Sequence, residues 1–467
     1  MQLSPFGSHF WPNAYDNIQP RVGLAYRFGD RTVLRAAYGR FYDNWAAVLQ
    51  MAQNQQGTWP RADQFIVSFN NVNAPPTVFA ENPLQGANTT PLPTPFEQNN
   101  WFVDPNLKNP YSDQWNIGIQ EAVTKNATLT TNYVASHGHR LDVGITGNQA
   151  TTPDPTGQLL IPSVSCYTTT CTPALVAAQG RFPFPYQIPT HYDESIGKSW
   201  YDALQVSFNQ KTSHGLTLLL SYTWSKTIDI GSDGWFAADG SSVQDPYHLE
   251  NDRSLAGFDV PHIFTTHWVY DLPFGSGKKF QTGNRFVDGI AGGWQVNGIV
   301  NFQSGQLYNL SALNTIPRVG SILQERANLV GDPNSGACPN GASVGTRTCW
   351  FNISAFAVPS TGTFGTFSRN VLRADGRNNL DLSIFRNFPI TERTRLEFRA
   401  EAFNVTNSPI WGLPNSNISS NLKCLVKFTD QCPAGQLDLK NNTFGVVTTT
   451  ATGYAPRQLQ FALKFYY

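Results

Sequence analysis

The feature that most constrains the fold is an alternation of apolar and polar residues with a period of two, which recurs in paired segments. Residues 21–28 and 33–38 form the first pair, with Gly29-Asp30-Arg31 as a turn between them. Successive side chains of a β-strand point to opposite faces, so this pattern predicts a hairpin with one apolar face. Four further pairs and one single segment follow the same pattern: 115–119 with 129–133, 204–208 with 216–224, 264–270 with 294–302, 380–384 with 396–402, and 459–467.

The connections between these segments alternate between short and long. Within the pairs they are mostly about three to six residues long, with 273–291 as the exception. Between the pairs they are long: 43–111, 137–199, 227–260, 305–379 and 407–457. Loops of this length are uncommon in compact soluble domains. Short turns at one end and long loops at the other are typical of transmembrane antiparallel β-barrels of the outer membrane, where the turns are periplasmic and the loops extracellular.

Charged residues follow the same two registers. A Lys or Arg facing lipid costs about 2–4 kcal/mol at mid-bilayer and about 0–1 kcal/mol near the interface. The apolar register carries charges only near segment ends: Arg40, Glu121, Lys226, Arg386 and Arg457. The opposite register carries Arg395, Glu397, Arg399 and Glu401, which we expect to form a charge ladder that faces the lumen and pairs internally. A soluble β-sandwich would instead turn its apolar register inward, and the loop lengths favour the barrel.

The last segment alternates up to the final residue of the sequence. Leu459, Phe461, Leu463, Phe465 and Tyr467 share one register, and chain termini are more often frayed and polar. This ending resembles the signal by which the barrel-assembly machinery recognises outer-membrane proteins. If this segment runs toward the periplasm, counting back gives the first segment the same direction. Because such barrels have an even number of strands, we expect a further strand before residue 18 and therefore a larger parent protein.

Composition excludes several other classes of protein. The 467 residues include 32 basic and 32 acidic side chains, and a net charge of zero argues against nucleic-acid binding. Charged residues make up 14%, against roughly a quarter in ordinary soluble domains. An aromatic content of 13% argues against disorder. A transmembrane helix is not expected, because the sequence contains no apolar stretch of 18 residues.

The six cysteines indicate an oxidising compartment. They occur as close pairs, Cys166/Cys171, Cys338/Cys349 and Cys424/Cys432, which favours three local disulfides among the 15 possible pairings. Buried free thiols or a metal site are the alternatives, although the CxxC spacing of a zinc site is absent. The first thirty residues have neither the basic nor the apolar region of a signal peptide. An oxidising location therefore implies a missing N-terminus.

Three possible ligand sites have simpler interpretations. The acidic residues of one long connection are Asp229, Asp233, Asp239, Asp245, Glu250 and Asp252. They lack the spacing of a calcium loop, which favours a solvated acidic loop. His137 and His139 lack a third metal ligand nearby and are interpreted as plain loop residues. Residues 275–279, Gly-Ser-Gly-Lys-Lys, lack the spacing of a phosphate-binding loop and are expected to form a periplasmic turn.

Catalysis is not expected either, since the sequence shows no G-x-S-x-G motif and no recognisable acid/base pair. We therefore predict a protein that is not an enzyme and that has no cofactor and no metal site. Aromatic residues near segment ends suit the girdles found at the two membrane interfaces, with ordinary sheet packing as the alternative. They are Tyr26, Phe28, Trp115, Trp200, Tyr201, Trp224, Trp268, Trp294 and Phe388.

The chain resembles the TonB-dependent outer-membrane receptors, specifically their Oar-like branch. The resemblance covers essentially the whole chain and is most specific at 20–44, NPYSDQWNIGIQ (109–120), 201–229, 251–264, 380–407 and PRQLQFALKFYY (456–467). It implies a 22-stranded barrel with an N-terminal plug, of which residues 1–467 would be the C-terminal 11 or 12 strands. The plug, the TonB-contacting segment, the early strands and the signal peptide are absent from this sequence.

The resemblance implies a receptor in the outer membrane of a Gram-negative bacterium. Long extracellular loops would capture an unknown ligand, and uptake would be energised by the TonB complex acting on the plug that this sequence lacks. The implied partners are outer-membrane lipid, the barrel-assembly machinery, the TonB complex and the ligand, with no nucleic acid. Two alternatives remain open: a secreted all-β adhesion or glycan-binding protein, and a non-functional truncated receptor.

Overall fold

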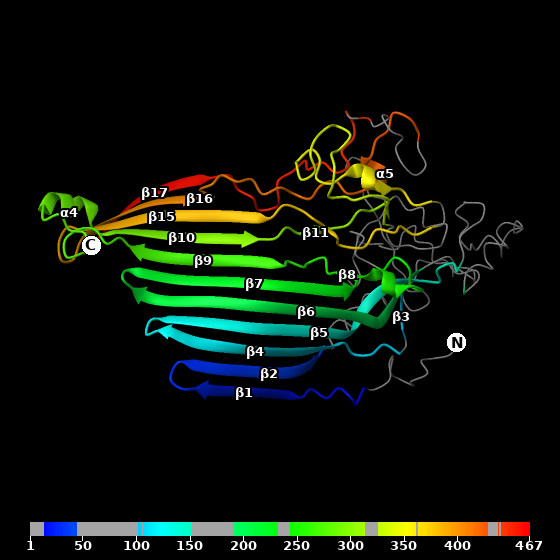
Figure 1. The fold of residues 1–467 in the computed structure, drawn as a ribbon, viewed down its shortest axis with the longest axis horizontal. Helices are drawn as coiled ribbons and strands as arrows, with labels where there is room; N and C mark the ends of the chain where they lie inside the picture. The colour runs from blue at the N-terminus through cyan, green and yellow to red at the C-terminus, as the bar shows by residue number, and fades with distance from the viewer. Residues whose placement is uncertain are drawn as a thin grey trace, which may run out of the picture.

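The computed structural model describes eleven long strands joined into one antiparallel sheet. Its described residues are 14–43, 101–104, 106–151, 183, 190–231, 243–312, 326–360, 363–427, 438 and 440–467. The eleven strands, in sheet order, are β1 (Arg21–Phe28), β2 (Thr32–Tyr42), β4 (Tyr111–Thr124), β5 (Ala127–Gly147), β6 (Thr190–Ser213), β7 (Leu216–Ile230), β9 (His262–Asp271), β10 (Trp294–Gln303), β15 (Arg377–Pro389), β16 (Arg395–Phe403) and β17 (Gln458–Tyr466). Strand order therefore follows chain order (Figure 1), and the five predicted hairpins and the final strand are confirmed.

Shorter elements lie around this sheet. β3 (Trp101–Val103) pairs in parallel with β6, and β8 (Arg253–Leu255) pairs with β7. Two small ribbons join β11 (Leu307–Tyr308) to β14 (Leu372–Arg373) and β12 (Asn328–Leu329) to β13 (Phe356–Ala357). The helical segments are η1 (Leu249–Asp252), α4 (Arg285–Ala291), η3 (Ile353–Ala355) and α5 (Ile418–Asn421). Figure 1 shows the short turns and α4 at one end of the sheet, here called the turn end, and the long connections at the other, the loop end.

Strand register sorts the side chains onto two faces. On β7, Leu220 is opposite Phe208 and Thr266, whereas Leu219 is opposite Asn209 and His267. We call the face that carries Leu220 the apolar face and the other the polar face. Along the whole sheet the apolar face presents large exposed side chains: Val22, Leu24, Tyr26, Phe28, Ile117, Ile119, Leu204, Trp224, Leu459, Phe461, Leu463 and Phe465. An apolar surface of this extent is not stable in water, whereas a membrane barrel places it in lipid.

Two strands extend well beyond the length needed to cross a bilayer. A transmembrane β-strand needs about 9–11 residues, whereas β5 has 21 and β6 has 24. The expectation of a loop over 137–199 is therefore wrong at both of its ends. His137 and His139 lie inside β5, not in a loop, because β6 continues to pair with β5 up to Gly147. The paired extension carries the two strands past the neighbouring ends at the loop end (Figure 1).

The turn between β6 and β7 at the other end is tight because two of its residues adopt left-handed backbone conformations. β6 and β7 are joined through His214 and Gly215, with φ values of 52° and 83°. A Cβ atom added to Gly215 would lie 2.8 Å from the backbone oxygen of Asp271 on the next strand. Glycine therefore suits both the turn and the close approach of β9.

The sheet has two edges that are open among the described residues. β1 pairs there only with β2, and β17 only with β16. The expectation of further strands that close a barrel remains a prediction.

The two faces predict opposite responses to one added charge at neighbouring positions. Leu220→Arg places a guanidinium on the apolar face near the middle of β7 and is expected to lower the free energy of unfolding by about 2–4 kcal/mol. Leu219→Arg, on the polar face, is the matched control and is expected to cost much less. Urea titration of the protein in lipid vesicles measures both. Equal losses for the two variants would contradict the assignment of faces.

Candidate functional site

The polar face offers hydrogen-bonding groups along most strands. It carries Gln114, Asn116, Asn132, Gln205, Asn209, Gln295, Asn297 and Asn301. Some of these groups are already paired across strands: the Gln295 side-chain amide donates a hydrogen bond to the Asp271 carboxylate at 2.9 Å. A face of this kind suits an aqueous path through a barrel.

The predicted charge ladder lies on this polar face of β16. The Arg399 guanidinium forms an ion pair with Glu397, which lies opposite Lys464 on β17. The Arg395 guanidinium lies 4.5 Å from the centre of the Tyr466 ring. Internal contacts therefore engage at least three members of the ladder, and Glu401 lies on the same face opposite Gln460.

A hollow of about 520 Å³ opens on the polar face across β1, β2, β4, β5 and β6. Its floor is made of the small residues Gly23, Ala37 and Gly39 together with backbone of the neighbouring strands. Polar and aromatic side chains surround this floor: Arg21, Phe41, Gln114, Asn116, Ser136 and Tyr201. Small residues leave the space, and the surrounding groups supply hydrogen bonds and ring contacts, as in many ligand sites.

Tyr201 corrects one expectation. It was assigned to an aromatic girdle facing lipid, but its register partners are Ser136 and Thr227, which lie on the polar face. Its neighbour Trp200 lies on the apolar face opposite His137 and Ile228. Adjacent residues of a strand cannot both face lipid, so Tyr201 contributes to the hollow.

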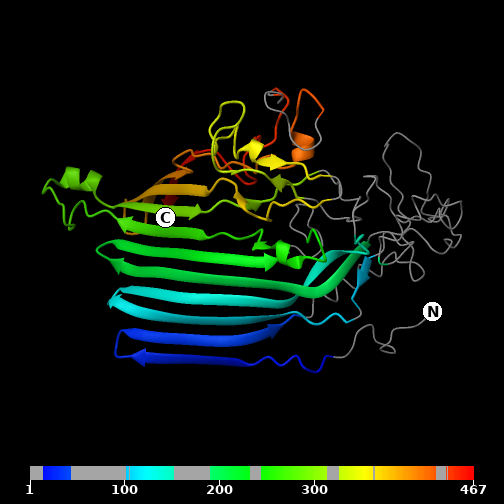
Figure 2. The ribbon, with the colours of Figure 1, turned by 45° about the vertical axis from the view of Figure 1, so that its right-hand side comes forward.

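The long connections β10–β15 and β16–β17 fold together into a cap at the loop end. Figures 1 and 2 show them side by side above the upper strands. The cap has its own apolar core, in which Phe351 contacts Phe444 and Phe356 contacts Phe367 at ring distances of 5.1 and 5.0 Å. Leu310 and Ile418, one from each connection, are fully buried beside them. The cap is therefore a packed unit with a defined shape.

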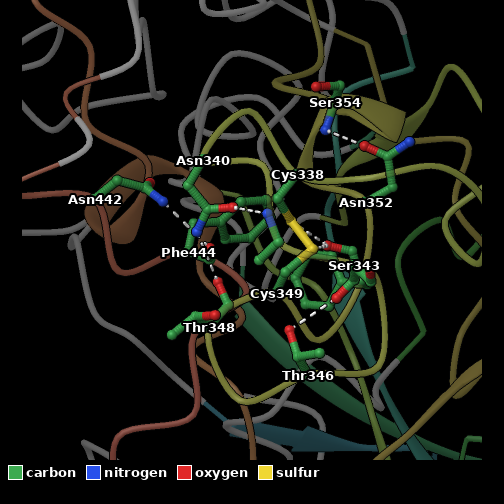
Figure 3. The surroundings of a disulfide bond; sticks show 12 residues. Cys338, Asn340, Ser343, Thr346, Thr348, Cys349, Asn352, Ser354, Asn442 and Phe444 are labelled. Carbon is green, nitrogen blue, oxygen red and sulfur yellow. Dashed lines mark hydrogen bonds between the residues drawn. A yellow bond between two sulfur atoms is a disulfide. The ribbon is translucent and has the colours of Figure 1, made fainter.

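A disulfide lies within this core. Cys338 is bonded to Cys349 with their Cα atoms 5.9 Å apart, and both residues are buried. The Asn340 side chain closes the same loop, since it donates to the Thr348 carbonyl and accepts from the Ala342 amide (Figure 3). Cys424 is also disulfide-bonded. Cys166, Cys171 and Cys432 lie outside the described residues.

Removing the Cys338–Cys349 bond is expected to loosen the cap without disrupting the sheet. A disulfide that closes a loop of this size contributes about 3 kcal/mol by restricting the unfolded chain. We expect the double variant C338S/C349S to be cut by protease within the cap at a lower temperature than the parent protein. The strands supply the internal control and should resist cleavage equally in both proteins. An unchanged cleavage temperature would show that core packing alone holds the loop.

Three arginine–aspartate pairs fasten the cap to the strands below it. Each arginine belongs to the β10–β15 connection, and each aspartate lies at the end of β7 or in the connection that follows it. The pairs are Arg326 with Asp252, at 2.9 Å, Arg369 with Asp229, and Arg373 with Asp259. All the aspartates are buried, as are Arg326 and Arg369. Buried charges are tolerated only when they are paired and hydrogen-bonded.

Arg369 is the most extensively bound of the three cations. Its side chain is fully buried, and it donates to the backbone oxygens of both Asp229 and Asp252 in addition to the Asp229 carboxylate. Burial raises the pKa of the Asp252 carboxyl, an effect that the guanidinium groups of Arg326 and Arg369 oppose. One cation thus connects the end of β7 to the end of η1.

These pairs correct the expectation of a solvated acidic loop. Asp229 and Asp252 are buried and paired, whereas Glu250 is exposed and contacts His248 at 3.2 Å. Asp245 is half-buried and accepts a hydrogen bond from the Tyr247 amide. Asp233 and Asp239 lie outside the described residues. Within the part of the chain that the structure describes, no group of three or more His, Cys, Asp or Glu residues could hold a metal ion.

Neutralising one buried anion should weaken the attachment of the cap. Asp252→Asn leaves Arg326 buried without its counter-charge, a change that typically costs about 3–5 kcal/mol. Glu250→Gln removes an exposed carboxylate from the same short helix and is expected to change stability by less than about 0.5 kcal/mol. The temperature at which protease first cuts the cap distinguishes them. A similar small shift for both variants would show that the Asp252 pair does not fasten the cap.

The histidine and phosphate-loop candidates also have defined positions. His137 lies 3.7 Å from Asp202, and His139 lies 3.8 Å from Asp113. Both contacts are cross-strand pairs on neighbouring strands. Gly275 and Gly277 have φ values of 101° and 73° and form a turn between β9 and α4.

None of the helices among the described residues is long and apolar enough to cross a membrane.

Comparison with known families decides between a membrane wall and a soluble sheet. Residues 3–460 match the family model described as "Outer membrane beta barrel domain". The chain belongs to this family. The outer membrane β-barrel domain is thus located in the outer membrane of a Gram-negative cell, with its apolar face in lipid. A search of curated proteins gave no match.

Several solved structures share low similarity with this outer membrane β-barrel domain. The outer membrane transporter YddB from Escherichia coli is 11% identical, with a TM-score of 0.39, and the match covers 93% of this chain and 38% of that one. FpvA from Pseudomonas aeruginosa bound to pyoverdine is 11% identical over 96% of this chain and 36% of that one, with a TM-score of 0.39. BauA, the ferric preacinetobactin receptor from Acinetobacter baumannii, is 11% identical over 96% of this chain and 36% of that one, with a TM-score of 0.38. The domain thus spans about a third of their length.

Sequence reasoning missed the cap and its attachment. Arg326, Arg369 and Arg373 are three of eight charged residues in their connection, and no local pattern distinguishes them. Their partners lie 74 to 140 residues away, well outside any local pattern, and only the fold brings the pairs together.

Proposed function

We propose that this outer membrane β-barrel domain forms part of the wall and the extracellular cap of a TonB-dependent receptor. In this proposal the cap captures a ligand, the polar face lines its path, and a plug moved by the TonB complex admits it to the periplasm. The observation that carries the proposal is the hollow on the polar face, at the same end of the sheet as a folded, covalently closed cap. A protein that only anchored itself in the membrane would need neither feature.

The stiffness of the cap supports ligand capture. A loop that is already ordered pays less conformational entropy when it binds. The Phe351 cluster, the Cys338–Cys349 bond and the buried arginine–aspartate pairs all order the cap before any ligand arrives. The sequence segments that resemble TonB-dependent receptors lie mainly in the strands, which leaves ligand choice to the cap and the hollow.

The polar face supports passage rather than covalent chemistry. Its polar groups are mostly amides and hydroxyls, and Arg395, Glu397 and Arg399 of the ladder contact one another or Tyr466. Paired charges leave a wall that is polar but not strongly charged, and such a wall does not trap a passing solute. The ladder is also placed to contact a plug from one side of the lumen.

Uptake should require both the TonB complex and the hollow. We expect the parent receptor, in cells, to deplete one compound class from a medium containing ferric siderophores, oligosaccharides and peptides, and only when the TonB complex is intact. Tyr201→Ala removes a ring from the hollow and should slow depletion about tenfold, the equivalent of about 1.4 kcal/mol. Leu204→Ala, on the apolar face of the same strand, should leave the rate unchanged.

Mass spectrometry of the medium measures the depletion. Depletion that persists in cells without the TonB complex would contradict energised uptake. Equal slowing by Tyr201→Ala and Leu204→Ala would contradict a role for the hollow, because only Tyr201 faces it.

A further inference from the structure

The connection between β9 and β10 is unlike the other connections at the turn end. It folds into a turn over residues 273–283 followed by α4, instead of a short hairpin turn. Asn284 caps the helix by accepting hydrogen bonds from the Phe286 and Val287 amides. The Asp288 carboxylate accepts from the Thr282 amide and hydroxyl, which holds the turn against the helix. The segment is therefore a defined structure at the turn end (Figure 1).

One side of α4 is apolar and almost fully exposed. Phe286 is 83% and Ile290 is 73% exposed, and residues four apart lie one above the other on a helix. Val287 lies beside them and is 46% exposed. In the preceding turn, Phe274 and Phe280 are also exposed, with their rings 5.6 Å apart. This concentration of exposed apolar side chains marks an interaction surface.

The C-terminal end of α4 accepts hydrogen bonds from two residues of the apolar face. The Trp294 indole donates a hydrogen bond to the Ile290 carbonyl at 3.0 Å, and the Arg386 guanidinium donates to the carbonyls of Gly289 and Ile290. Trp294 and Arg386 are cross-strand neighbours on the apolar face of β10 and β15. The surface of α4 is thus continuous with the surface that contacts lipid.

Basic residues flank the apolar side chains. Lys278, Lys279 and Arg285 are all exposed, and the Lys279 amine lies 5.4 Å from the centre of the Phe280 ring. The only acidic residue of the segment, Asp288, is buried against Thr282 and Gly283. Exposed aromatic and aliphatic side chains beside uncompensated basic ones are typical of segments that lie in a membrane interface. Basic residues beside a membrane surface are attracted to the phosphates of anionic lipids.

We propose that residues 273–292 are an interfacial anchor that binds phospholipid of the inner leaflet of the outer membrane. The apolar side of α4 enters the boundary between headgroups and acyl chains, and Lys278, Lys279 and Arg285 contact lipid phosphates. The turn end is the periplasmic end, because short turns of such barrels are periplasmic. The anchor fixes the depth of the wall at β9 and β10, and it does not depend on any transport activity.

A fluorescent label at Ile290 tests the position of the helix. The full chain carrying Ile290→Cys is labelled with NBD and reconstituted into vesicles of phosphatidylethanolamine and phosphatidylglycerol. Glu392→Cys, in the exposed turn between β15 and β16 at the same end, is the matched control, and the unsubstituted chain measures background labelling of native cysteines. We expect nitroxide-bearing lipid to quench the label at Ile290 several-fold more strongly than the label at Glu392.

The contrary results are equally specific. If aqueous iodide quenches both labels equally and nitroxide lipid quenches neither, α4 lies in water and the proposal is overturned. The same result is expected if the apolar side of α4 binds a periplasmic protein, since the vesicles contain none. Repeating the measurement with Phe286→Cys guards against a local effect of one substitution.

The basic residues are tested separately. In the Ile290→Cys background, Lys278→Gln, Lys279→Gln and Arg285→Gln are combined and compared in vesicles with and without phosphatidylglycerol. Contact with anionic lipid predicts that the triple variant loses lipid quenching only in the vesicles that contain phosphatidylglycerol. Unchanged quenching in those vesicles would overturn the contact with phosphates.

Discussion

The structure depends on one constraint: every strand must present apolar side chains to lipid on one face and polar side chains on the other. In a bilayer no water is available to satisfy an exposed backbone, so the strands must also pair continuously along their length. The antiparallel register keeps the two faces separate from β1 to β17, and the nine inner strands are paired on both sides. Among the described residues, β1 and β17 are paired on one side, with β2 and β16. The short turns, the aromatic residues near strand ends and the low charge content are consequences of this constraint.

The loop end obeys a different constraint, since its residues are in water and must form a core of their own. The cap does this with a cluster around Phe351, with the Cys338–Cys349 bond and with buried ion pairs to the strands. A buried pair adds little net stability compared with apolar packing, but it fixes which groups meet. Three such pairs join the β10–β15 connection to β7 and to the connection that follows it, and they therefore define how the cap sits on β7 and η1.

The loop end and the turn end of the sheet differ in which side chains they expose to solvent. At the loop end, the three arginine–aspartate pairs remove most of their charged groups from solvent. At the turn end, Phe286 and Ile290 of α4 are exposed. The basic residues of the same segment are also exposed, and its one acidic residue, Asp288, is buried. This asymmetry agrees with a cap that faces water and a helix that faces a lipid interface, and it links the shape of the domain to its orientation in the membrane.

The amino-acid sequence by itself determined the five hairpins, the final strand and the family resemblance, but not the extensions of β5 and β6. Alternation with a period of two is a local property, so the hairpin from Val22 to Tyr38 and the final strand through Phe461 could be predicted from neighbouring residues alone. It also predicted that Arg395, Glu397, Arg399 and Glu401 share one face, which is the polar face of β16.

Only the tertiary structure decided the contacts between distant segments. The burial of Asp252 against Arg326, the position of Tyr201 in the hollow and the attachment of α4 through Arg386 all join residues from different connections or strands. Tyr201 shows the reason most clearly, because a shift of one residue along a strand moves a side chain to the opposite face. Local pattern fixes which residues alternate, but three-dimensional packing fixes which of them meet.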